Sequence, residues 1–361
     1  MDLAKAYDQV PRDKLWECLQ EYGVDGELLR AVQSLYKGSS ACVRVNDTKS
    51  TPFLVGVGLR QGCVLSPILF ATFMDRVEKR SRGTECVKIG DVEVSKLLFA
   101  DDLALLASTQ EDLQQALDRF AAECEVDGMK VNTSMTEVMA FSRQPMECTL
   151  HVSGAQLRQV EEFKYLGILF SSDGKQDKEI SRRINAASTI LRELWTVTGN
   201  GRISMQAKLA IFKALYRSCL TYGHESWILT ERTRSRVQAA EMRSFGESQE
   251  LPGWTTSGTP ASERPWGVEP LILHTEKSQL RWYGHVLRMN PDRLVPRIMN
   301  AFPGERRPVG RPRTRWVDQV KELFRRTGKN PADAEFLAAN RVMWKALTTS
   351  LPPRSERIRR A

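Results

Sequence analysis

The sequence predicts an α+β protein in which helices pack on a sheet, followed by a helical domain and a basic, mostly helical C-terminal region. Three observations favour this fold class. Residues 1–143 alternate amphipathic helical patterns with short runs of β-forming residues, which is typical of helices packed on a sheet. Residues 160–240 contain two long helical patterns. The excess positive charge lies beyond residue 240.

Helical and strand-like patterns alternate along the first region, residues 1–143. Apolar residues recur at helical spacing in four segments, 12–20, 26–36, 67–80 and 111–125. Residues 41–45 and 96–107 are rich in β-forming residues. Because Asp101 and Asp102 interrupt the second of these runs, we expect a hairpin with both carboxylates at or near its tip.

The second region begins with a strand-like run at 163–170. Two amphipathic helices are predicted at about 177–195 and 204–222, separated by Gly199 and Gly201. This arrangement indicates a helical second domain.

The composition changes after the second region. Residues 244–266 are crowded with Ser, Thr, Gly and Pro and show no helical or strand period, so residues 244–270 are predicted to be a linker or a degenerate segment. A helical pattern returns at 276–289, within a C-terminal region that spans 271–361. The tail from Pro352 is rich in Pro and Arg, and we expect it to fray.

The net charge of +9 is unevenly placed along the chain. Residues 1–240 hold 31 basic and 31 acidic side chains, whereas residues 241–361 hold 22 and 13. Such an excess suits a polyanion such as nucleic acid, because neutralised phosphates release counterions, although charge alone is equally consistent with a solvated basic surface. The expected nucleic-acid contacts are five clustered arginines: Arg306, Arg307, Arg311, Arg313 and Arg315.

The seven cysteines are scattered and never spaced C-x-x-C, which favours a reduced, intracellular chain. No cysteine follows Cys219, so we expect no zinc knuckle, and His274 and His285 are expected to pack or to lie on the surface. No apolar run approaches the roughly 18 residues of a membrane span, and the N-terminus lacks a signal-peptide pattern. We therefore expect no membrane partner.

Two motifs offer carboxylates. Phe99-Ala100-Asp101-Asp102 places adjacent acids at a predicted hairpin tip, where they can hold Mg²⁺, although a solvated turn explains the pair alone equally well. Asp2 offers a third carboxylate, five positions before Tyr7.

A third motif runs from Gly58 to Pro67 and is a glycine-punctuated loop that leads into a helix. Pro67 suits the first helical turn, and Ser66 is expected to cap it. Such a loop lets backbone N–H groups approach a phosphate or sugar.

In this order, D-x-x-K-A-Y-D, G-x-R-Q-G-x-x-L-S-P and F-A-D-D resemble three successive polymerase motifs of the reverse transcriptases of non-LTR (LINE-type) retrotransposons. The resemblance continues through G-M-K-V-N at 128–132 and F-K-Y-L-G at 163–167, and covers roughly residues 1–240. R-W-Y-G-H at 281–285 and G-R-P-R-T-R-W at 310–316 look like the downstream segment of such elements.

The resemblance implies an RNA-directed DNA polymerase that transfers nucleotides to a primer 3′-hydroxyl with two Mg²⁺ ions, for which Mn²⁺ is the alternative. RNA template, DNA primer and dNTP are the implied partners, and the nucleus is the implied compartment. Asp2, Asp101 and Asp102 match the catalytic, metal-binding carboxylates. Tyr7 matches the aromatic residue under the sugar that excludes a 2′-hydroxyl.

Further roles follow from the same comparison. Gln61 and Gly62 match the loop that lies against the incoming nucleotide and the template base. Residues 1–160 match an antiparallel palm, and residues 161–243 match the primer-grip strand and the helical thumb. The primer grip corresponds to Tyr165, Leu166 and Gly167. Asp8 carries no catalytic role in this comparison, and we expect a helix-start or turn carboxylate.

Three departures from the family pattern support an alternative. Met1 stands directly before Asp2, so we expect the fingers region to be absent. Met135 replaces a lysine that is a proposed proton donor, and a thioether cannot donate a proton. Residues 244–266 do not resemble the family. From these departures we expect this chain to polymerise DNA poorly. The alternative function is a catalytically inactive retrotransposon remnant that at most binds nucleic acid. A two-metal phosphohydrolase on another fold would not explain Tyr7 or the Gln61–Gly62 loop.

Overall fold

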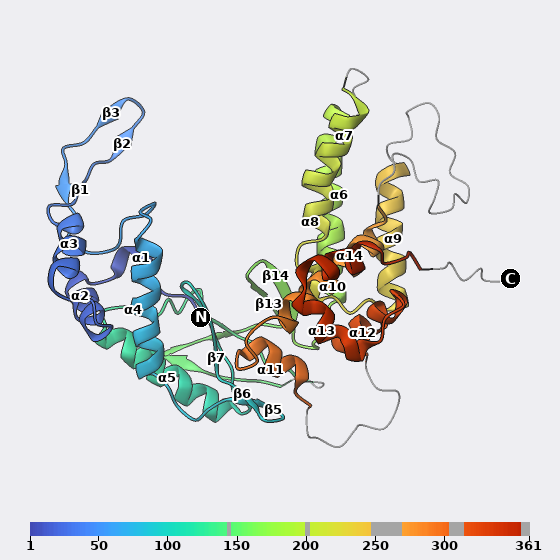
Figure 1. Cartoon of the computed structure of the whole chain (residues 1–361). Helices are drawn as coiled ribbons and strands as arrows, with labels where there is room; N and C mark the ends of the chain where they lie inside the picture. Colours follow the sequence, from blue (N-terminus) through green and yellow to red (C-terminus); the bar gives the residue numbers. More distant parts are fainter. Residues whose placement is uncertain (143–145, 199–202, 247–268, 303–313, 355–361) are drawn as a thin grey trace. The chain divides into compact units, whose positions relative to one another are not determined.

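The structure, a computed structural model, describes residues 1–142, 146–198, 203–246, 269–302 and 314–354 (Figure 1). The chain divides into two compact units, Met1–Glu161 and Glu162–Ala361. Among the residues so described, no helix has the length and apolar character needed to cross a membrane.

The first unit combines helices with short strands. Its helices are α1 (Ala6–Gln9), α2 (Arg12–Glu21), α3 (Gly26–Tyr36), α4 (Ser66–Arg80) and α5 (Gln110–Val126). Antiparallel pairs join β1 (Ser40–Ala41) to β4 (Phe53–Leu54), β2 (Arg44–Val45) to β3 (Thr48–Lys49), β5 (Val87–Ile89) to β6 (Val92–Val94), β7 (Lys96–Phe99) to β8 (Asp102–Leu105), and β10 (His151–Val152) to β11 (Ala155–Gln156). β9 (Glu137–Val138) pairs in parallel with β12 (Arg158–Gln159).

The mixture of helices and small sheets is that of an α+β protein, but the expected antiparallel pairing does not hold between β9 and β12, which are parallel. The β10–β11 hairpin lies between these two strands in the sequence, so the chain returns to pair in the same direction. The expected strand at 41–45 is also divided, between β1 and β2.

The core of the first unit lies between α2, α4 and α5. Helix α4 buries an apolar stripe that includes Phe70, Phe73 and Val77, each at most 1% exposed. Next to that stripe, the buried guanidinium of Arg76 donates from Nη2 to Asp127 Oδ1 at 2.5 Å, just beyond the end of α5. This ion pair links α4 to the end of α5, and removing one partner would leave the other charge buried without it.

Helix predictions in this unit are confirmed within one or two residues, but one capping prediction is wrong. Leu65, not Ser66, precedes α4, and no side chain caps the helix. The hydroxyl of Ser66 instead donates to the carbonyl oxygen of Arg60 at 2.7 Å, because the loop before the helix turns back over it. Pro67 lies in the first turn, as expected.

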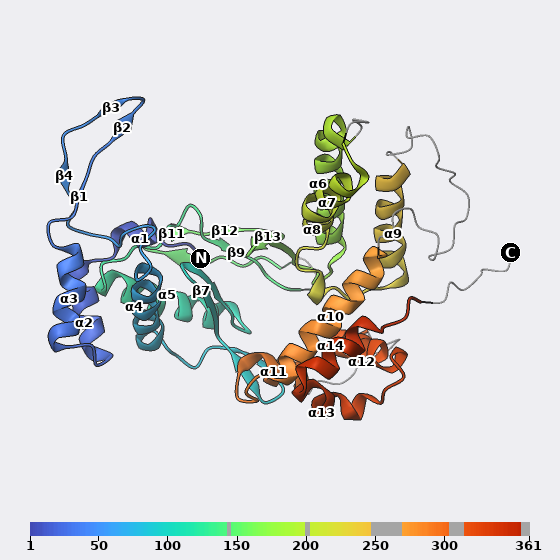
Figure 2. The same cartoon turned by 45° about the horizontal axis from the view of Figure 1, so that its top comes forward.

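The second unit is mainly helical (Figure 2). It starts with the hairpin β13 (Glu162–Tyr165) and β14 (Ile168–Ser171). Helical segments follow in this order: α6 (Asp177–Thr198), α7 (Met205–Ile211), the π-helix η1 (Phe212–Arg217), α8 (Ser218–Leu220), η2 (His224–Ser226), α9 (Glu231–Gly246), α10 (Leu271–Leu287), α11 (Leu294–Asn300), α12 (Trp316–Arg326), η5 (Pro331–Asp333), α13 (Ala334–Ala339) and α14 (Arg341–Thr349).

Three predictions for this unit are corrected. The expected single strand at 163–170 is a hairpin, because Leu166 and Gly167 take positive φ values of 47° and 80° and reverse the chain. The expected helix at 204–222 is interrupted by a π-helical turn. Helix α9 continues to Gly246, past the expected linker start at 244, and residues 247–268 lie outside the described residues.

A close contact between α10 and α14 organises the C-terminal helices. A Cβ atom at Gly284 would lie 2.1 Å from Nε1 of Trp344, so only glycine permits this approach. The same indole nitrogen donates to the carbonyl oxygen of Leu280 at 3.0 Å. Tyr283 and Phe324 pack beside Trp344 in one apolar cluster. Tyr283 and Gly284 of the R-W-Y-G-H motif therefore serve packing.

His274 packs against a second histidine, as a packing role predicts. Its ring stacks on that of His224 with a centroid distance of 5.6 Å. Burial, together with the charges of Arg217 and His224, lowers the pKa of His274 to about 4. Burial also lowers the pKa of His224. The folded unit therefore holds both rings neutral at pH values where free histidine binds a proton.

We expect the second unit to lose stability as the pH falls from about 6.5 towards 4. In that window the unfolded chain takes up a proton that folded His274 does not, so acid favours unfolding. Thermal unfolding of the wild type should show a lower midpoint at pH 5 than at pH 7.5, and His274→Gln should reduce the difference. An equal pH dependence in both proteins would contradict this assignment.

Candidate active site

Asp2 lies in an extended segment next to β8 of the β7–β8 hairpin. The backbone nitrogen of Met1 donates to Leu103 O at 2.7 Å, and Leu103 N donates to Met1 O at 3.3 Å. In antiparallel pairing this register sets Asp2 opposite Asp102, with both side chains on one face. The expected position of Asp2 beside the hairpin is therefore confirmed, and its metal-binding role stays a prediction.

Asp101 lies in the turn of the hairpin. Phe99 and Asp102 are paired, so Ala100 and Asp101 form the two-residue connection, and Ala100 has a positive φ of 54°. Asp101 and Asp2 are half-buried and Asp102 is exposed. The predicted hairpin tip is thus correct, and it places all three aspartates at one end of the sheet.

The segment after α5 holds Asp2 from its other side. Asn132 N donates to Asp2 O at 2.9 Å, and Asn132 Nδ2 donates to Asp2 Oδ2 at 2.9 Å. The backbone nitrogen of Asp2 donates to Oγ1 of buried Thr136 at 3.3 Å. Neither Asn132 nor Thr136 was predicted to contact Asp2, although the G-M-K-V-N motif that ends at Asn132 was the available signal.

The carboxylates do not form a closed metal cage. No group of three His, Cys, Asp or Glu side chains in the described part of the chain is arranged to hold a metal ion. One oxygen of Asp2 is occupied by Asn132, and like charges directly opposite on neighbouring strands repel each other. The site gathers negative charge but leaves most coordination positions to other ligands.

The glycine-rich loop is fastened beside α1. Gly58 N donates to Val10 O at 2.9 Å, and Leu59 N donates to Tyr7 O at 2.8 Å. A Cβ atom at Gly58 would lie 2.6 Å from the carbonyl oxygen of Asp8. The Asp8 carboxylate in α1 accepts a hydrogen bond from Gln61 Nε2 at 3.1 Å, which matches its expected local role.

The aromatic ring of Tyr7 is held by α4. It stacks on Phe70 with a centroid distance of 4.5 Å and an interplanar angle of 20°. Tyr7 is half-buried, whereas Gln61 and Gly62 are exposed. The structure therefore brings Tyr7 and the loop together on one side of α1.

Arg12 fixes the loop, and the sequence analysis missed it. Its guanidinium donates to Val55 O at 2.8 Å, to Gly58 O at 3.1 Å and to Val57 O at 3.3 Å. It also donates to Tyr36 O and lies over the Tyr36 ring. The loop has little regular strand pairing, so hydrogen bonds from Arg12 satisfy its backbone carbonyl groups.

Met135, where the family pattern has lysine, is 65% exposed. Its thioether therefore contributes little to packing. The position beside Thr136 keeps it near the segment that contacts Asp2.

The predicted primer-grip residues lie in the second unit, at the turn of β13–β14. The carbonyl oxygen of Leu166 accepts from the Tyr222 hydroxyl at 2.9 Å. Gly167 O accepts from Arg182 Nη2 at 2.8 Å and also from Arg183, whose guanidinium lies 4.5 Å from the Tyr222 ring centre. Hydrogen bonds therefore hold the turn to α6 and to Tyr222, two residues beyond α8.

Of the five arginines predicted to bind nucleic acid, the structure describes Arg315. It is half-buried, donates to Ala301 O at 3.2 Å and lies over the Phe302 ring. The other four, Arg306, Arg307, Arg311 and Arg313, lie outside the described residues. The neighbouring Trp316 donates from Nε1 to Glu225 O at 2.6 Å, so packing is its role.

Comparison with known proteins identifies the class. The model of the family described as reverse transcriptase (RNA-dependent DNA polymerase) matches residues 1–170. A Pol polyprotein from the type-2 retrotransposable element R2DM of Drosophila melanogaster is 30% identical over 185 residues, 48% of this chain and 18% of that protein. The RNA-directed DNA polymerase from mobile element jockey of the same species is 25% identical over 231 residues, 62% of this chain and 25% of that protein.

A third relative aligns with a longer part of the chain. The probable RNA-directed DNA polymerase from transposon BS of Drosophila melanogaster is 26% identical over 327 residues, 84% of this chain and 34% of that protein. Residues 1–170 therefore belong to the reverse transcriptase family of nucleotidyltransferases. Within it, their similarity is to the polymerases of non-LTR, LINE-type retrotransposons. The chain spans about a fifth to a third of the length of these relatives.

We expect Gly58→Ala to detach the loop from α1, whereas Gly62→Ala should leave it attached. Both glycines have positive φ, which costs alanine about 1 kcal/mol, but only Gly58 faces a backbone within 4 Å. Overpacking adds about 1–3 kcal/mol to the loss of unfolding free energy in Gly58→Ala. Urea unfolding and amide exchange at Leu59 measure the difference, and equal effects of the two substitutions would contradict the contact.

Proposed function

We propose that this chain catalyses RNA-directed DNA synthesis, adding deoxynucleotides to a primer 3′-hydroxyl. The observation that carries the proposal is the register of Met1 against Leu103, which sets Asp2 opposite Asp102 beside the turn that holds Asp101. The family membership of residues 1–170 supports this activity, and the inactive alternative is not favoured.

The donor set fits a divalent metal such as Mg²⁺, or Mn²⁺ in its place. Mg²⁺ is commonly bound by one or two carboxylates together with waters and substrate phosphates, so a closed cage of protein ligands is not needed. Asp2, Asp101 and Asp102 would hold it, and a cation would relieve the repulsion between opposed carboxylates. When bound, the metal supplies charge stabilisation for nucleotidyl transfer. Asn132 keeps Asp2 in place throughout.

The two units have separate parts in the proposal. Residues 1–161 would form the palm, with Tyr7 beneath the sugar and Gln61 and Gly62 against the nucleotide and the template base. The hairpin turn at Leu166–Gly167 would contact the primer end, and α6 to α8 would form the thumb. An RNA template, a DNA primer and dNTPs would be the partners, and action in the nucleus would follow from priming at chromosomal DNA.

Primer extension tests the activity. The purified chain should extend a primed RNA template with Mg²⁺ and dNTPs. Asp101→Asn and Asp102→Asn should each lower the rate at least about 10²-fold, the scale of losing one preorganised electrostatic group. Asp91→Asn is the matched control, because Asp91 occupies the exposed turn of β5–β6. Extension equal in all four proteins, or none by the wild type, would contradict the proposal.

Selection against ribonucleotides tests the placement of Tyr7. Tyr7→Ala should raise incorporation of ribonucleotides relative to deoxynucleotides by about tenfold or more, because the ring held by Phe70 no longer fills the space of a 2′-hydroxyl. Tyr7→Phe keeps the ring and should retain the discrimination. Competition assays with paired nucleotides measure the ratio, and an unchanged ratio in Tyr7→Ala would exclude a gating role.

A further inference from the structure

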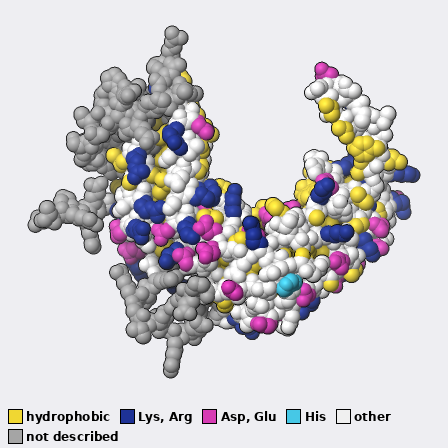
Figure 3. All heavy atoms as spheres, turned by 180° about the vertical axis from the view of Figure 1, so that it is seen from behind, with side chains coloured by type: hydrophobic (Ala, Val, Ile, Leu, Met, Phe, Trp, Pro, Cys, Tyr) yellow, Lys and Arg dark blue, Asp and Glu magenta, His cyan; other side chains and the backbone are white. Residues whose placement is uncertain are grey.

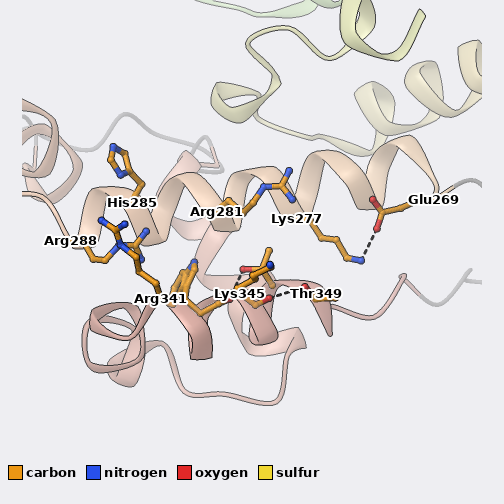
Figure 4. A pocket seen from close by; sticks show the side chains of 10 residues that line it. Glu269, Lys277, Arg281, His285, Arg288, Arg341, Lys345 and Thr349 are labelled. Atoms are coloured by element: carbon orange, nitrogen blue, oxygen red, sulfur yellow. Dashed lines mark hydrogen bonds and ion pairs between the residues drawn. The ribbon is translucent and has the colours of Figure 1, made fainter. Parts of the chain in front are cut away.

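A basic pocket lies between α10 and α14 in the second unit (Figure 4). Its volume is about 650 Å³, and Trp344 contributes to its wall. The polar side chains that line it are Glu269, Lys277, Arg281, His285, Arg288, Arg341, Lys345, Thr348 and Thr349. All of these residues belong to the second unit.

Helical spacing explains why the basic side chains converge. On α10, Lys277, Arg281 and His285 recur every four residues, so they share one face. Arg341 and Lys345 have the same spacing on α14. The neighbouring faces of both helices are buried in the apolar cluster around Trp344, which holds the two basic faces beside each other.

The charge of the pocket is not balanced by the protein. Glu269 is the only carboxylate lining this described pocket, and it already pairs with Lys277 at 2.6 Å and lies 3.5 Å from His274. Arg281, Arg341 and Lys345 form no ion pair within the described residues. By contrast, basic and acidic side chains are interspersed on the molecular face drawn in Figure 3.

Arg288 adds a partly buried cation to the same pocket. It donates from Nη1 to Ala338 O at 3.0 Å, while its buried Nε has no partner among the described residues. Burial, with the charge of Arg341 beside it, lowers the pKa of Arg288. Gathering like charges in this way is unfavourable unless an anion neutralises them.

We propose that the α10–α14 pocket binds the phosphodiester backbone of nucleic acid. Arginine guanidinium groups suit phosphate oxygens, to which they donate in pairs. The cations extend from Lys277 to Arg288, a rise of about 16 Å along α10, which is too long for one phosphate group and suits a repeating polyanion. Contacts of this kind bind without sequence preference.

A charge-matched pair of variants of the full chain tests this site. The pocket variant combines Arg281→Gln, Arg341→Gln and Lys345→Gln. The control variant combines Arg232→Gln, Arg325→Gln and Lys329→Gln, which removes the same charge from exposed positions of the second unit outside the pocket. Fluorescence anisotropy with labelled single-stranded RNA and DNA of about 20 nucleotides, longer than a typical single-strand site, measures binding.

The pocket variant should bind at least about tenfold more weakly than the control variant, and the slope of log affinity against log salt should shrink by about 2–3. Because Lys345 is exposed, Lys345→Gln alone should fold and reduce the slope by about 1. Equal binding by the pocket and control variants would overturn the proposal. So would equal competition by inorganic phosphate or by polyglutamate, which would indicate a small-anion or acidic-peptide site. Asp101→Asn should bind normally, so this result is independent of polymerase activity.

Discussion

The candidate site depends on one piece of backbone pairing, the insertion of residues 1–3 between β8 and residues 130–132. Met1 bonds to Leu103 on one side, and Leu3 bridges Val131 on the other. The register is fixed by burial, because Leu3 and Leu103 are each 2% exposed and face the core. A slip of one residue would expose Leu3 and turn Asp2 into the core, so the apolar residues of this strand decide where its carboxylate lies.

The glycine-rich loop obeys a related constraint. It has little regular pairing of its own, so its backbone is satisfied by partners from other elements: Tyr7 and Val10 accept its N–H groups, and Arg12 donates to its carbonyl groups. Its place is therefore set by hydrogen bonds more than by packing. This leaves Gln61 and Gly62 exposed on a loop whose base is fixed, a suitable arrangement for contact with a ligand.

Sequence patterns predicted what is local and missed what is distant. Helices α2 to α5 were found because each carries an apolar stripe several turns long, and the Asp101–Asp102 hairpin because acids interrupt a β-rich run. The turn at Leu166–Gly167 was missed because Leu166 is a residue that rarely takes positive φ. Asn132 and Asp2 are in contact although 130 positions separate them in the sequence, and 46 positions separate Arg12 from Gly58. The periodicity of apolar residues cannot predict contacts between residues so far apart in the sequence.

Packing also determines where positive charges gather in the second unit. Gly284 costs helix α10 about 1 kcal/mol relative to alanine. Because glycine has no side chain, the indole of Trp344 fits against this position. The indole donates a hydrogen bond to the Leu280 carbonyl oxygen and brings α14 against α10. On α14, Lys345 directly follows Trp344, and Arg341 precedes Trp344 by one helical turn. How closely these two cations approach Arg281 on α10 therefore depends on how deeply the Trp344 indole inserts against α10. A side chain larger than glycine at position 284 would move α14 outward and disperse the positive charge. The R-W-Y-G-H motif therefore combines two functions. Tyr283 and Gly284 form a buried packing contact, and Arg281 and His285 line the basic pocket.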